Sequence, residues 1–218
     1  LVLSSAMIPA SAVASARASD FDGDGASDVF WRDTGSGANV LWPSADRTAR
    51  RTMASVPDPA WHVVAQGDFN GDGTADVLWR NLVSGGNVVW DSANRTTRRT
   101  LETVTDRRWK VVGAGDFDGD GRSDVFWRNA VTGANAIWRS AVRSSPLAVA
   151  SVTDMAWVVA GIADFDGDGA SDVLWRNTAT GADAIWRAAN KGDQQAVASV
   201  ANQAWEIAGV GDFDADGR

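Results

Sequence analysis

The chain has 218 residues, of which 44% are hydrophobic, and its 20 basic and 28 acidic residues give a net charge of −8. The absence of Cys excludes disulfides and Cys-based metal or redox chemistry, and the single His excludes a His-rich metal site. The charge disfavours a nucleic-acid partner, and no apolar run is long enough for membrane insertion.

Residues 1–16 differ from the rest of the chain because they are small, apolar and uncharged, and they end in Ala12-Val-Ala-Ser-Ala16. This pattern predicts a signal-peptide remnant with an Ala-x-Ala cleavage site, and therefore a secreted, extracellular protein. The alternative is a degenerate copy of the preceding unit, since Ile8-Pro9 aligns with Val56-Pro57.

Residues 17–218 repeat with a period of 48 residues. An Asp-rich motif begins at Asp20, Asp68, Asp116, Asp164 and Asp212. All 12 Trp residues occupy three positions of the repeat: Trp31, Trp79, Trp127 and Trp175; Trp42, Trp90, Trp138 and Trp186; Trp61, Trp109, Trp157 and Trp205. Self-similarity at this period is typical of repeat architectures.

Each unit predicts four short strands, which in the second unit cover residues 61–69, 76–81, 87–90 and 98–104. These segments are rich in β-branched and aromatic residues and are bounded by Gly, Asp and Asn. Four strands in 48 residues favour an all-β fold, a β-propeller built from four-stranded blades, over a solenoid. Because the sequence stops inside a fifth Asp loop, we expect a fragment of a larger propeller.

The Asp loops carry the strongest chemical signal. Carboxylates at loop positions 1, 3, 5 and 9, with Gly at position 6 and a backbone carbonyl at position 7, provide the hard oxygen ligands that Ca²⁺ prefers. The predicted ligands are Asp20, Asp22, Asp24, Ala26 and Asp28; Asp68, Asn70, Asp72, Thr74 and Asp76; Asp116, Asp118, Asp120, Arg122 and Asp124; Asp164, Asp166, Asp168, Ala170 and Asp172; and Asp212, Asp214 and Asp216.

The charge distribution supports a cation at these loops, because they hold 18 of the 26 Asp residues and like charges gathered there repel one another. An EF-hand is excluded, since Trp31 stands where the Glu at position 12 should be. A metal-free alternative remains open, in which the Asp carboxylates accept hydrogen bonds from backbone N–H groups of the turn.

The motif Asp-Phe-Asp-Gly-Asp-Gly-x-x-Asp-Val, at residues 20–29 and 164–173, resembles the FG-GAP/VCBS repeat. The resemblance covers about residues 20–218, and it implies propeller blades that bind calcium through these loops. The 48-residue unit with Trp-Arg-Asn at 79–81 and Trp-x-Val-Val at 109–112 is also similar to Trp-rich seven-bladed bacterial propeller lectins. That second resemblance implies sugar binding between blades.

A sugar platform is predicted at the end of the blade opposite the Asp loops, where an indole would cover the apolar face of a sugar and polar groups would orient it. The candidate residues are Trp61, Trp109, Trp157, Trp205, Arg80, Asn81, Arg128 and Asn129. The alternative is that a Trp recurring in every unit fills the space between blades. Arg50-Arg51 and Arg98-Arg99, on the outer strands, either discourage edge pairing or contact an anionic surface.

Together these features predict a secreted, calcium-binding propeller module that binds carbohydrate, such as a cell-surface glycan, and that is not an enzyme. No Ser–His–Asp set can recur with one His, and the paired carboxylates lie inside the metal-like loops. The alternatives are a protein-binding adhesion scaffold and a non-catalytic propeller domain appended to a secreted enzyme.

Overall fold

The computed structural model describes residues 19–213, so the predicted signal-peptide remnant and loop residues Asp214 and Asp216 lie outside the described part. The described chain forms β-strands joined by turns and short 3-10 helices. The strands are β1 (Val29–Arg32), β2 (Asn39–Trp42), β3 (Arg51–Met53), β4 (Trp61–Gly67), β5 (Asp76–Asn81), β6 (Asn87–Trp90), β7 (Arg99–Leu101), β8 (Trp109–Gly115), β9 (Asp124–Asn129), β10 (Asn135–Trp138), β11 (Pro146–Val149), β12 (Trp157–Ala163), β13 (Asp172–Asn177), β14 (Asp183–Trp186) and β15 (Gln194–Val197). The 3-10 helices are η1 (Pro43–Ala45), η2 (Arg47–Ala49), η3 (Asp91–Ala93), η4 (Arg95–Thr97), η5 (Arg139–Ala141) and η6 (Arg187–Ala189).

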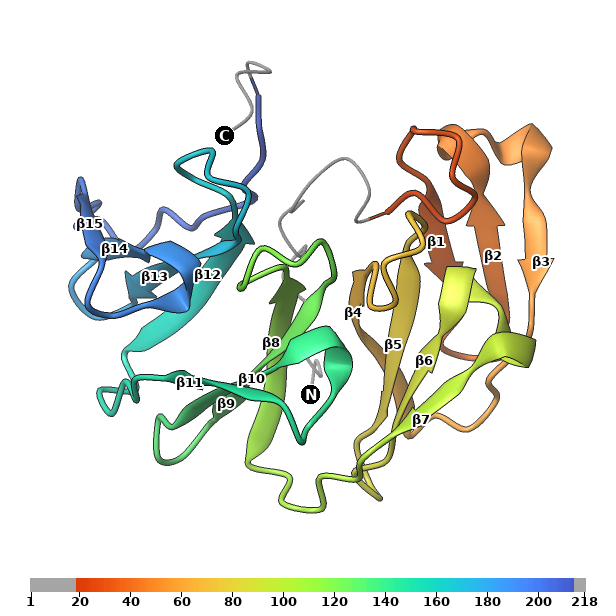
Figure 1. Ribbon diagram of the computed structural model, residues 1–218, viewed down its shortest axis with the longest axis horizontal. Helices are drawn as coiled ribbons and strands as arrows, with labels where there is room; N and C mark the ends of the chain where they lie inside the picture. Colours follow the sequence, from red (N-terminus) through yellow and green to blue (C-terminus); the bar gives the residue numbers. More distant parts are fainter. Residues whose placement is uncertain (1–18, 214–218) are drawn as a thin grey trace.

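The strands form four antiparallel sheets in which neighbours in sequence are neighbours in space. Blade 1 contains β1–β3, blade 2 contains β4–β7, blade 3 contains β8–β11 and blade 4 contains β12–β15. Figure 1 shows the blades arranged as a fan, with the innermost strands β4, β8 and β12 towards the centre and β7, β11 and β15 towards the outside. This arrangement confirms the predicted propeller fold built from 48-residue blades.

Two predicted strand boundaries differ from the structure. The first strand of the second unit ends at Gly67 rather than residue 69, because the Phe69 N–H is taken by a carboxylate of the loop. The outer strand covers Arg99–Leu101 rather than 98–104, because Val104 N–H donates to the Gly85 carbonyl in the neighbouring turn instead of pairing with β6. Each inner strand also contains a bulge, as between Val63 and Ala65.

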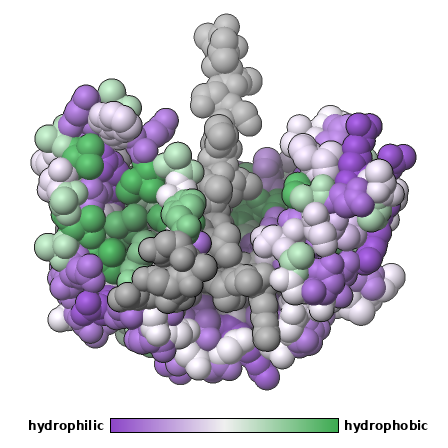
Figure 2. Space-filling view, turned by 90° about the horizontal axis from the view of Figure 1, so that it is seen from above, coloured by the Kyte–Doolittle hydropathy of each residue, from purple (hydrophilic) through white to green (hydrophobic). Residues whose placement is uncertain are grey.

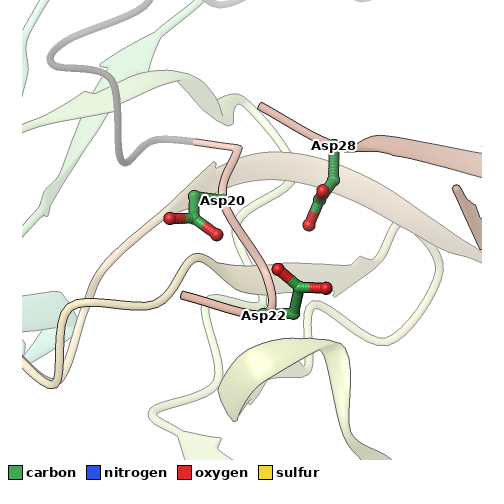
Figure 3. Close-up of side chains that lie close together, drawn as sticks. All are labelled: Asp20, Asp22 and Asp28. Atoms are coloured by element: carbon green, nitrogen blue, oxygen red, sulfur yellow. The ribbon is translucent and has the colours of Figure 1, made fainter. Parts of the chain in front are cut away.

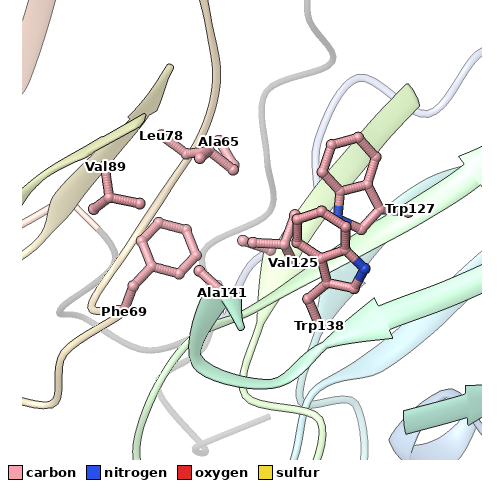
Figure 4. Packing of buried hydrophobic residues seen from close by; sticks show 9 residues of the cluster. Ala65, Phe69, Leu78, Val89, Val125, Trp127, Trp138 and Ala141 are labelled. Carbon is pink, nitrogen blue, oxygen red and sulfur yellow. The ribbon is translucent and has the colours of Figure 1, made fainter. Parts of the chain in front are cut away.

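Three hydrophobic clusters lie where neighbouring blades meet. In the cluster between blades 2 and 3, Phe69 and Leu78 face Val125 and Trp127 (Figure 4), and all four side chains are buried. Trp79, Trp127 and Trp175 are the largest fully buried side chains of the described chain. Burial of an aromatic side chain stabilises a fold by about 1.5–3 kcal/mol, so the blades depend on their neighbours for stability.

The end blades expose what the inner blades bury. Trp31 is 48% exposed, whereas its repeat equivalents Trp79, Trp127 and Trp175 are almost completely buried. In Figure 2, hydrophobic side chains gather on the left arm, which is the side of blade 4. The described residues that follow blade 4 include Trp205 at 67% and Phe213 at 89% exposure. Within residues 19–213, no helix is long and apolar enough to cross a membrane.

Candidate functional site

The Asp loops connect the first and second strands of each unit and bring three carboxylates together. Asp20, Asp22 and Asp28, at loop positions 1, 3 and 9, converge in the first loop (Figure 3). Each contributes one oxygen to a group whose members all lie within 4.8 Å of one another, and the third and fourth loops form the same group. The members of those two groups are Asp116, Asp118 and Asp124, and Asp164, Asp166 and Asp172.

The carboxylates at positions 1 and 9 also organise the loop itself. In the first loop, Asp20 accepts hydrogen bonds from Gly23 N–H at 2.7 Å and Gly25 N–H at 2.9 Å. Asp28 accepts from Phe21 N–H at 2.8 Å and from Ser44 N–H at 2.7 Å. These are the backbone hydrogen bonds of the metal-free alternative, and they recur in the other complete loops at Asp68, Asp76, Asp116, Asp124, Asp164 and Asp172.

An unusual turn delivers the last of these donors. Ser44 and Ala45 both have positive φ, of 46° and 59°, as do the corresponding residues of the other blades. This left-handed conformation costs a non-glycine residue about 1–2 kcal/mol. In each blade the backbone N–H of the first of these two residues donates to the position-9 carboxylate. The turn after the third strand of the repeat unit, which is β2 in blade 1, is therefore hydrogen-bonded to the Asp loop.

The carboxylate at position 5 has a different role. Asp24 accepts a hydrogen bond from Ala26 N–H at 2.8 Å and from the Ser44 hydroxyl at 2.8 Å. Asp120 likewise accepts from Arg122 N–H at 2.9 Å. The position-5 side chains, Asp24, Asp120 and Asp168, are not members of the three convergent groups. The structure therefore brings together positions 1, 3 and 9 of the predicted ligand sets and directs position 5 to the loop backbone.

An arginine reaches the position-3 carboxylate in three of the loops. Arg51 pairs with Asp22 at 2.8 Å, Arg139 with Asp118 at 3.0 Å, and Arg187 with Asp166 at 2.8 Å. In blade 1 the arginine comes from the outer strand, whereas in blades 3 and 4 it follows the third strand. Because these pairs are partly exposed, each contributes little stability on its own, about 0–1 kcal/mol.

The second loop differs because Asn70 replaces the position-3 carboxylate. Its side-chain amide donates to Asp72 at 3.0 Å. Arg99, the repeat equivalent of Arg51, lies instead near Asp91 at 2.9 Å and Asp76 at 3.7 Å. Blade 2 thus lacks the third acidic ligand, and its arginine is directed elsewhere. In the incomplete fifth loop, Asp212 is the one candidate ligand within the described residues.

Burial changes the protonation of the position-9 carboxylates. Desolvation raises the pKa of Asp76 and of Asp124 to about 7, against the lowering effect of two backbone N–H donors at each. Desolvation also raises the pKa of Asp28 and of Asp172. These groups therefore resist ionisation when no cation is near, and a bound cation would favour their charged form.

The convergent groups fit a calcium ion by their chemistry and spacing. Two oxygens bound to one Ca²⁺ at 2.3–2.6 Å each can be at most about 5 Å apart, and the carboxylate groups meet that limit. All three are hard oxygen ligands. The first, third and fourth loops offer three carboxylates each, and the second offers two with the Asn70 amide oxygen.

At the opposite end of the blade, the predicted ligand residues Arg80 and Arg128 lie inside the protein. Arg128 is 5% exposed and donates to the carbonyls of Gly133 at 3.2 Å, Val152 at 2.9 Å and Trp157 at 3.1 Å. Its guanidinium lies 5.0 Å from the ring centre of Trp175 in the next blade. We call Arg32, Arg80 and Arg128 the latch arginines, because each makes these bonds at a blade interface. Arg176 donates to the carbonyls of Val200 and Trp205 in the segment after blade 4, and its other terminal nitrogen pairs with Asp183.

Asn81 and Asn129 are also buried and close the adjacent turn. Asn129 accepts hydrogen bonds from Val131 N–H and Thr132 N–H, both at 3.0 Å, and Asn81 makes the equivalent bonds. Burial of the two arginines and two asparagines argues against the expected ligand role, because their polar groups serve the backbone. This outcome was not predicted from the sequence, although the Arg-Asn pair at the end of each strand was visible there.

The tight approach at this end requires glycine. Gly133 has φ of 71°, and a Cβ there would lie 2.0 Å from the Val152 carbonyl oxygen. The same contact recurs at Gly37, Gly85 and Gly181. The turn between the second and third strands therefore touches the crossing to the next blade, which confirms that both lie opposite the Asp loops.

The predicted tryptophans occupy two different environments. Trp61, Trp109 and Trp157 are half-buried and pack against the three inter-blade clusters, whereas Trp205 is exposed. Trp61 also lines a pocket of about 240 Å³ between blades 1 and 2. Trp79 and Trp90 line the same pocket, with ring centres 4.9 Å apart. Trp61 therefore packs against the core, as the alternative interpretation expected, and also lines a cavity, as a ligand platform would.

Polar groups stand beside these aromatic walls. The pocket is also lined by Pro57 and Asp58, from the crossing into blade 2, and by Arg95 and Arg98, from the segment before β7. Asp58 accepts hydrogen bonds from Ala60 N–H at 2.9 Å and from the Asn81 side chain at 3.5 Å. The sequence did not single out Arg95 or the pocket, because the lining residues come from the crossing after blade 1 and from separate segments of blade 2.

The fold and these loops can now be compared with known proteins. Residues 20–79 match the FG-GAP-like repeat family. No curated protein matches the sequence. Two solved structures are similar at low identity: a catalytically inactive virginiamycin B lyase from Staphylococcus aureus with quinupristin (8% identity, TM-score 0.49, 81% of this chain and 54% of that one) and a nidogen/laminin complex (14% identity, TM-score 0.44, 74% of this chain and 56% of that one).

The chain spans a little more than half of the length of each of those two solved chains. The family match covers the first Asp loop, the second Asp loop and the strands between them, and the 48-residue period extends the same unit beyond residue 79. Residues 20–79 therefore resemble an FG-GAP-like repeat, and the described chain has the antiparallel four-stranded sheets of a β-propeller fold.

Proposed function

We propose that the protein is an extracellular, calcium-stabilised binding module that recognises carbohydrate and has no catalytic role. The observation that carries the carbohydrate proposal is the pocket between blades 1 and 2, where half-buried Trp61 offers aromatic surface and the almost fully buried Trp79 and Trp90 complete the lining. A flat indole covers the apolar face of a sugar ring, while nearby polar groups fix its orientation. The volume of about 240 Å³ suits a single sugar ring rather than a longer saccharide buried whole.

The blades offer the same aromatic positions at each interface. Trp109 with Trp127 and Trp138, and Trp157 with Trp175 and Trp186, are the repeat equivalents of the pocket residues. Weak binding at several such positions would give avidity for a surface that displays many copies of one sugar. Extracellular placement rests on residues 1–16, which resemble a signal peptide.

A glycan array in millimolar calcium, with a parallel experiment in EDTA, tests carbohydrate binding. We expect saturable binding to one class of sugar and a loss of that binding in Trp61→Ala. Because Trp61 also packs against the core, the melting temperature of the Trp61→Ala variant must be measured as well. The more conservative Trp61→Phe should retain part of the sugar binding. If protein shown to be folded by circular dichroism binds no sugar, the carbohydrate proposal is wrong.

Calcium would act on the fold rather than on the ligand. The groups formed by loop positions 1, 3 and 9 would hold the ion, and the bound ion would neutralise the carboxylates that the loop gathers. If calcium binds the folded protein only, a concentration 100 times Kd stabilises it by about 2.7 kcal/mol per site. The metal would therefore replace the stabilisation that disulfides give other small extracellular domains.

Asp118→Asn tests the calcium proposal because, within residues 19–213, the Asp118 carboxylate pairs with Arg139 and accepts no hydrogen bond from the loop backbone. We expect a lower melting temperature in calcium and almost no change in EDTA. Arg139→Gln is the matched control, since it removes the same ion pair but keeps the carboxylate. An equal loss for Asp118→Asn in calcium and in EDTA would show that these loops are metal-free Asp turns.

A protein-binding adhesion scaffold is the second candidate function. The observation that favours it is the exposure of the hydrophobic side chains Val200, Trp205 and Phe213 in the segment after blade 4. Exposed apolar patches commonly mark protein interfaces. This function would be favoured if the folded wild-type protein binds no glycan but binds a cell-surface partner, and if Trp205→Ala abolishes that binding. The same result would also agree with a non-catalytic domain attached to a secreted enzyme.

A further inference from the structure

From the cations beside the inter-blade pocket, we infer that the pocket selects a saccharide that carries a carboxylate or a sulfate. The inference rests on the proposed carbohydrate function and adds the chemical class of the ligand. Arg95 and Arg98 line the pocket, and both are exposed at its rim. Within residues 19–213, neither guanidinium forms an ion pair with a carboxylate.

The hydrogen bonds of these two arginines leave donors available. Arg95 donates through Nη1 to the Ser55 carbonyl at 3.3 Å, and Arg98 donates through Nη1 to the Arg95 carbonyl at 3.3 Å. A guanidinium has five N–H donors, so each retains enough to bind an anion in a bidentate manner. Both contacts tie the side chains to the pocket wall and reduce the entropy lost when a ligand binds.

The acidic residue of the pocket does not cancel this positive charge. Asp58 lines the wall, but its two carboxylate oxygens accept hydrogen bonds from Ala60 N–H and the Asn81 side chain. Asp106 and Asp154 stand at the same repeat position in the crossings into blades 3 and 4, so a carboxylate recurs there, and Asn202 replaces it in the segment after blade 4. The pocket therefore presents two cations and one carboxylate that is already engaged.

The interfaces between blades 2 and 3 and between blades 3 and 4 lack such a pair of arginines, whereas blade 1 carries one at Arg47 and Arg50, outside this pocket. At the repeat equivalents of Arg95 and Arg98, blade 3 has Arg143 and Pro146, and blade 4 has Lys191 and Gln194. Each of those interfaces keeps one cation. The chain as a whole carries a charge of −8. Because charges farther than about 8 Å are screened at physiological salt, an anion that reaches the rim is attracted mainly by the two local arginines.

An acidic sugar can contact both the indole wall and the arginines at the rim of the pocket. Its ring would lie against the indole wall, and its charged group would lie at the rim beside Arg95 and Arg98. An ion pair next to an apolar wall is stronger than one in open water because the local dielectric constant is lower. A neutral sugar would make the aromatic contacts but leave both guanidinium groups to solvent.

The test compares matched sugars with the full chain in calcium: galactose, galacturonate and galactose 6-sulfate, and the same three forms of glucose, by isothermal titration calorimetry or saturation-transfer NMR. We expect the acidic forms of one series to bind at least about tenfold more tightly than the neutral form. The preference should weaken as NaCl is raised, whereas neutral-sugar binding should not. Comparing the carboxylated sugar with the sulfated sugar shows which of the two anionic groups the pocket prefers.

Two double variants locate the effect. Arg95→Gln/Arg98→Gln should bring the affinity for acidic sugars down to that for the neutral sugar, and the melting temperature should stay unchanged. Arg47→Gln/Arg50→Gln changes the repeat equivalents in blade 1, which are exposed and do not line the pocket, and removes the same net charge. That control should retain the preference.

Several outcomes would overturn the inference. Equal binding of neutral and acidic sugars would refute the charge selectivity but leave the carbohydrate function intact. An equal loss in the two double variants would assign the preference to general surface charge. Tight binding of a glutamate-rich peptide at this pocket, without sugar binding, would assign it to a protein partner. If no sugar of either kind binds the folded chain, the proposed function fails with it.

Discussion

The two ends of each blade hold charge in opposite ways. At the start of the second strand, as at Asp124, a buried carboxylate accepts backbone N–H groups and lies among other carboxylates. Four residues later, Arg128 donates to backbone carbonyls on both sides of a blade interface and lies over an indole ring. At one end several carboxylates lie close together, whereas at the other end one guanidinium donates hydrogen bonds to several carbonyls.

This difference shows why a cation can matter at one end and not at the other. Arg32, Arg80 and Arg128 donate to carbonyls of three segments without any added ion, so that end is complete in the protein alone. The Asp loops leave two or three carboxylates close together, and buried Asp76 and Asp124 have pKa values near neutrality. We therefore expect the Asp end to respond to pH and, under the calcium proposal, to metal, whereas we expect the arginine end to set the stability of the blade contacts.

The largest expected effect comes from breaking the arginine end. Arg128→Gln leaves the buried carbonyls of Val152 and Trp157 without their donor and removes the contact with Trp175. We expect a loss of about 3–5 kcal/mol in the free energy of unfolding, the same in calcium and in EDTA. Chemical denaturation measures it, and exposed Arg143→Gln is the control, with an expected change within about 0.5 kcal/mol. A loss that depends on calcium would contradict the assignment.

The next effect sharpens the comparison between the second loop and its neighbours. Asn70→Asp supplies the missing position-3 carboxylate of blade 2. In EDTA we expect a lower melting temperature, because Arg99 is engaged with Asp91 and Asp76 and the new charge is not neutralised. In calcium the variant should match or exceed the wild type. Melting curves in EDTA and in calcium test this expectation. A decrease in melting temperature of equal size in both would show that no cation enters this loop.

The pH dependence follows from the raised pKa values of Asp76 and Asp124. The folded pKa, about 7, exceeds the unfolded value of about 4, so between these values the folded state binds more protons. In EDTA the stability should therefore decrease as pH rises from 5 to 7 and level off above 8. Calcium should weaken this decrease, because a cation favours the charged carboxylates. A melting temperature that rises over the same interval in EDTA would contradict it.

The smallest effect concerns the turn that serves the Asp end. Ala188 has φ of 46°, and its N–H donates to Asp172 at 2.8 Å. Glycine adopts this conformation without the steric cost, so Ala188→Gly should stabilise the protein by about 0.5–1 kcal/mol. Ala184→Gly, in the middle of β14, should destabilise it by a similar amount. If both variants lose stability equally, the strain at residue 188 is not relieved by glycine.

Sequence periodicity alone determined the repeating unit and its strands. The 48-residue period, the segments 76–81 and 87–90 and the opposite placement of loops and turns all agree with the structure, because strand propensity and turn residues act over a few neighbouring positions. The convergence of loop positions 1, 3 and 9 was also predictable, since the whole loop is local in sequence. The assignment of calcium to those loops stays a prediction.

Only the tertiary structure decided how the polar residues are used. Arg128 reaches carbonyls 24 and 29 residues away, and Asp124 accepts from an N–H 16 residues away. The pocket likewise joins Pro57 with Trp90 and Arg98. A period in the sequence cannot show whether a recurring Arg faces solvent or a buried carbonyl, because that depends on how closely the next blade packs. For the same reason, Trp79 is core and Trp31 is exposed although both occupy one position of the repeat.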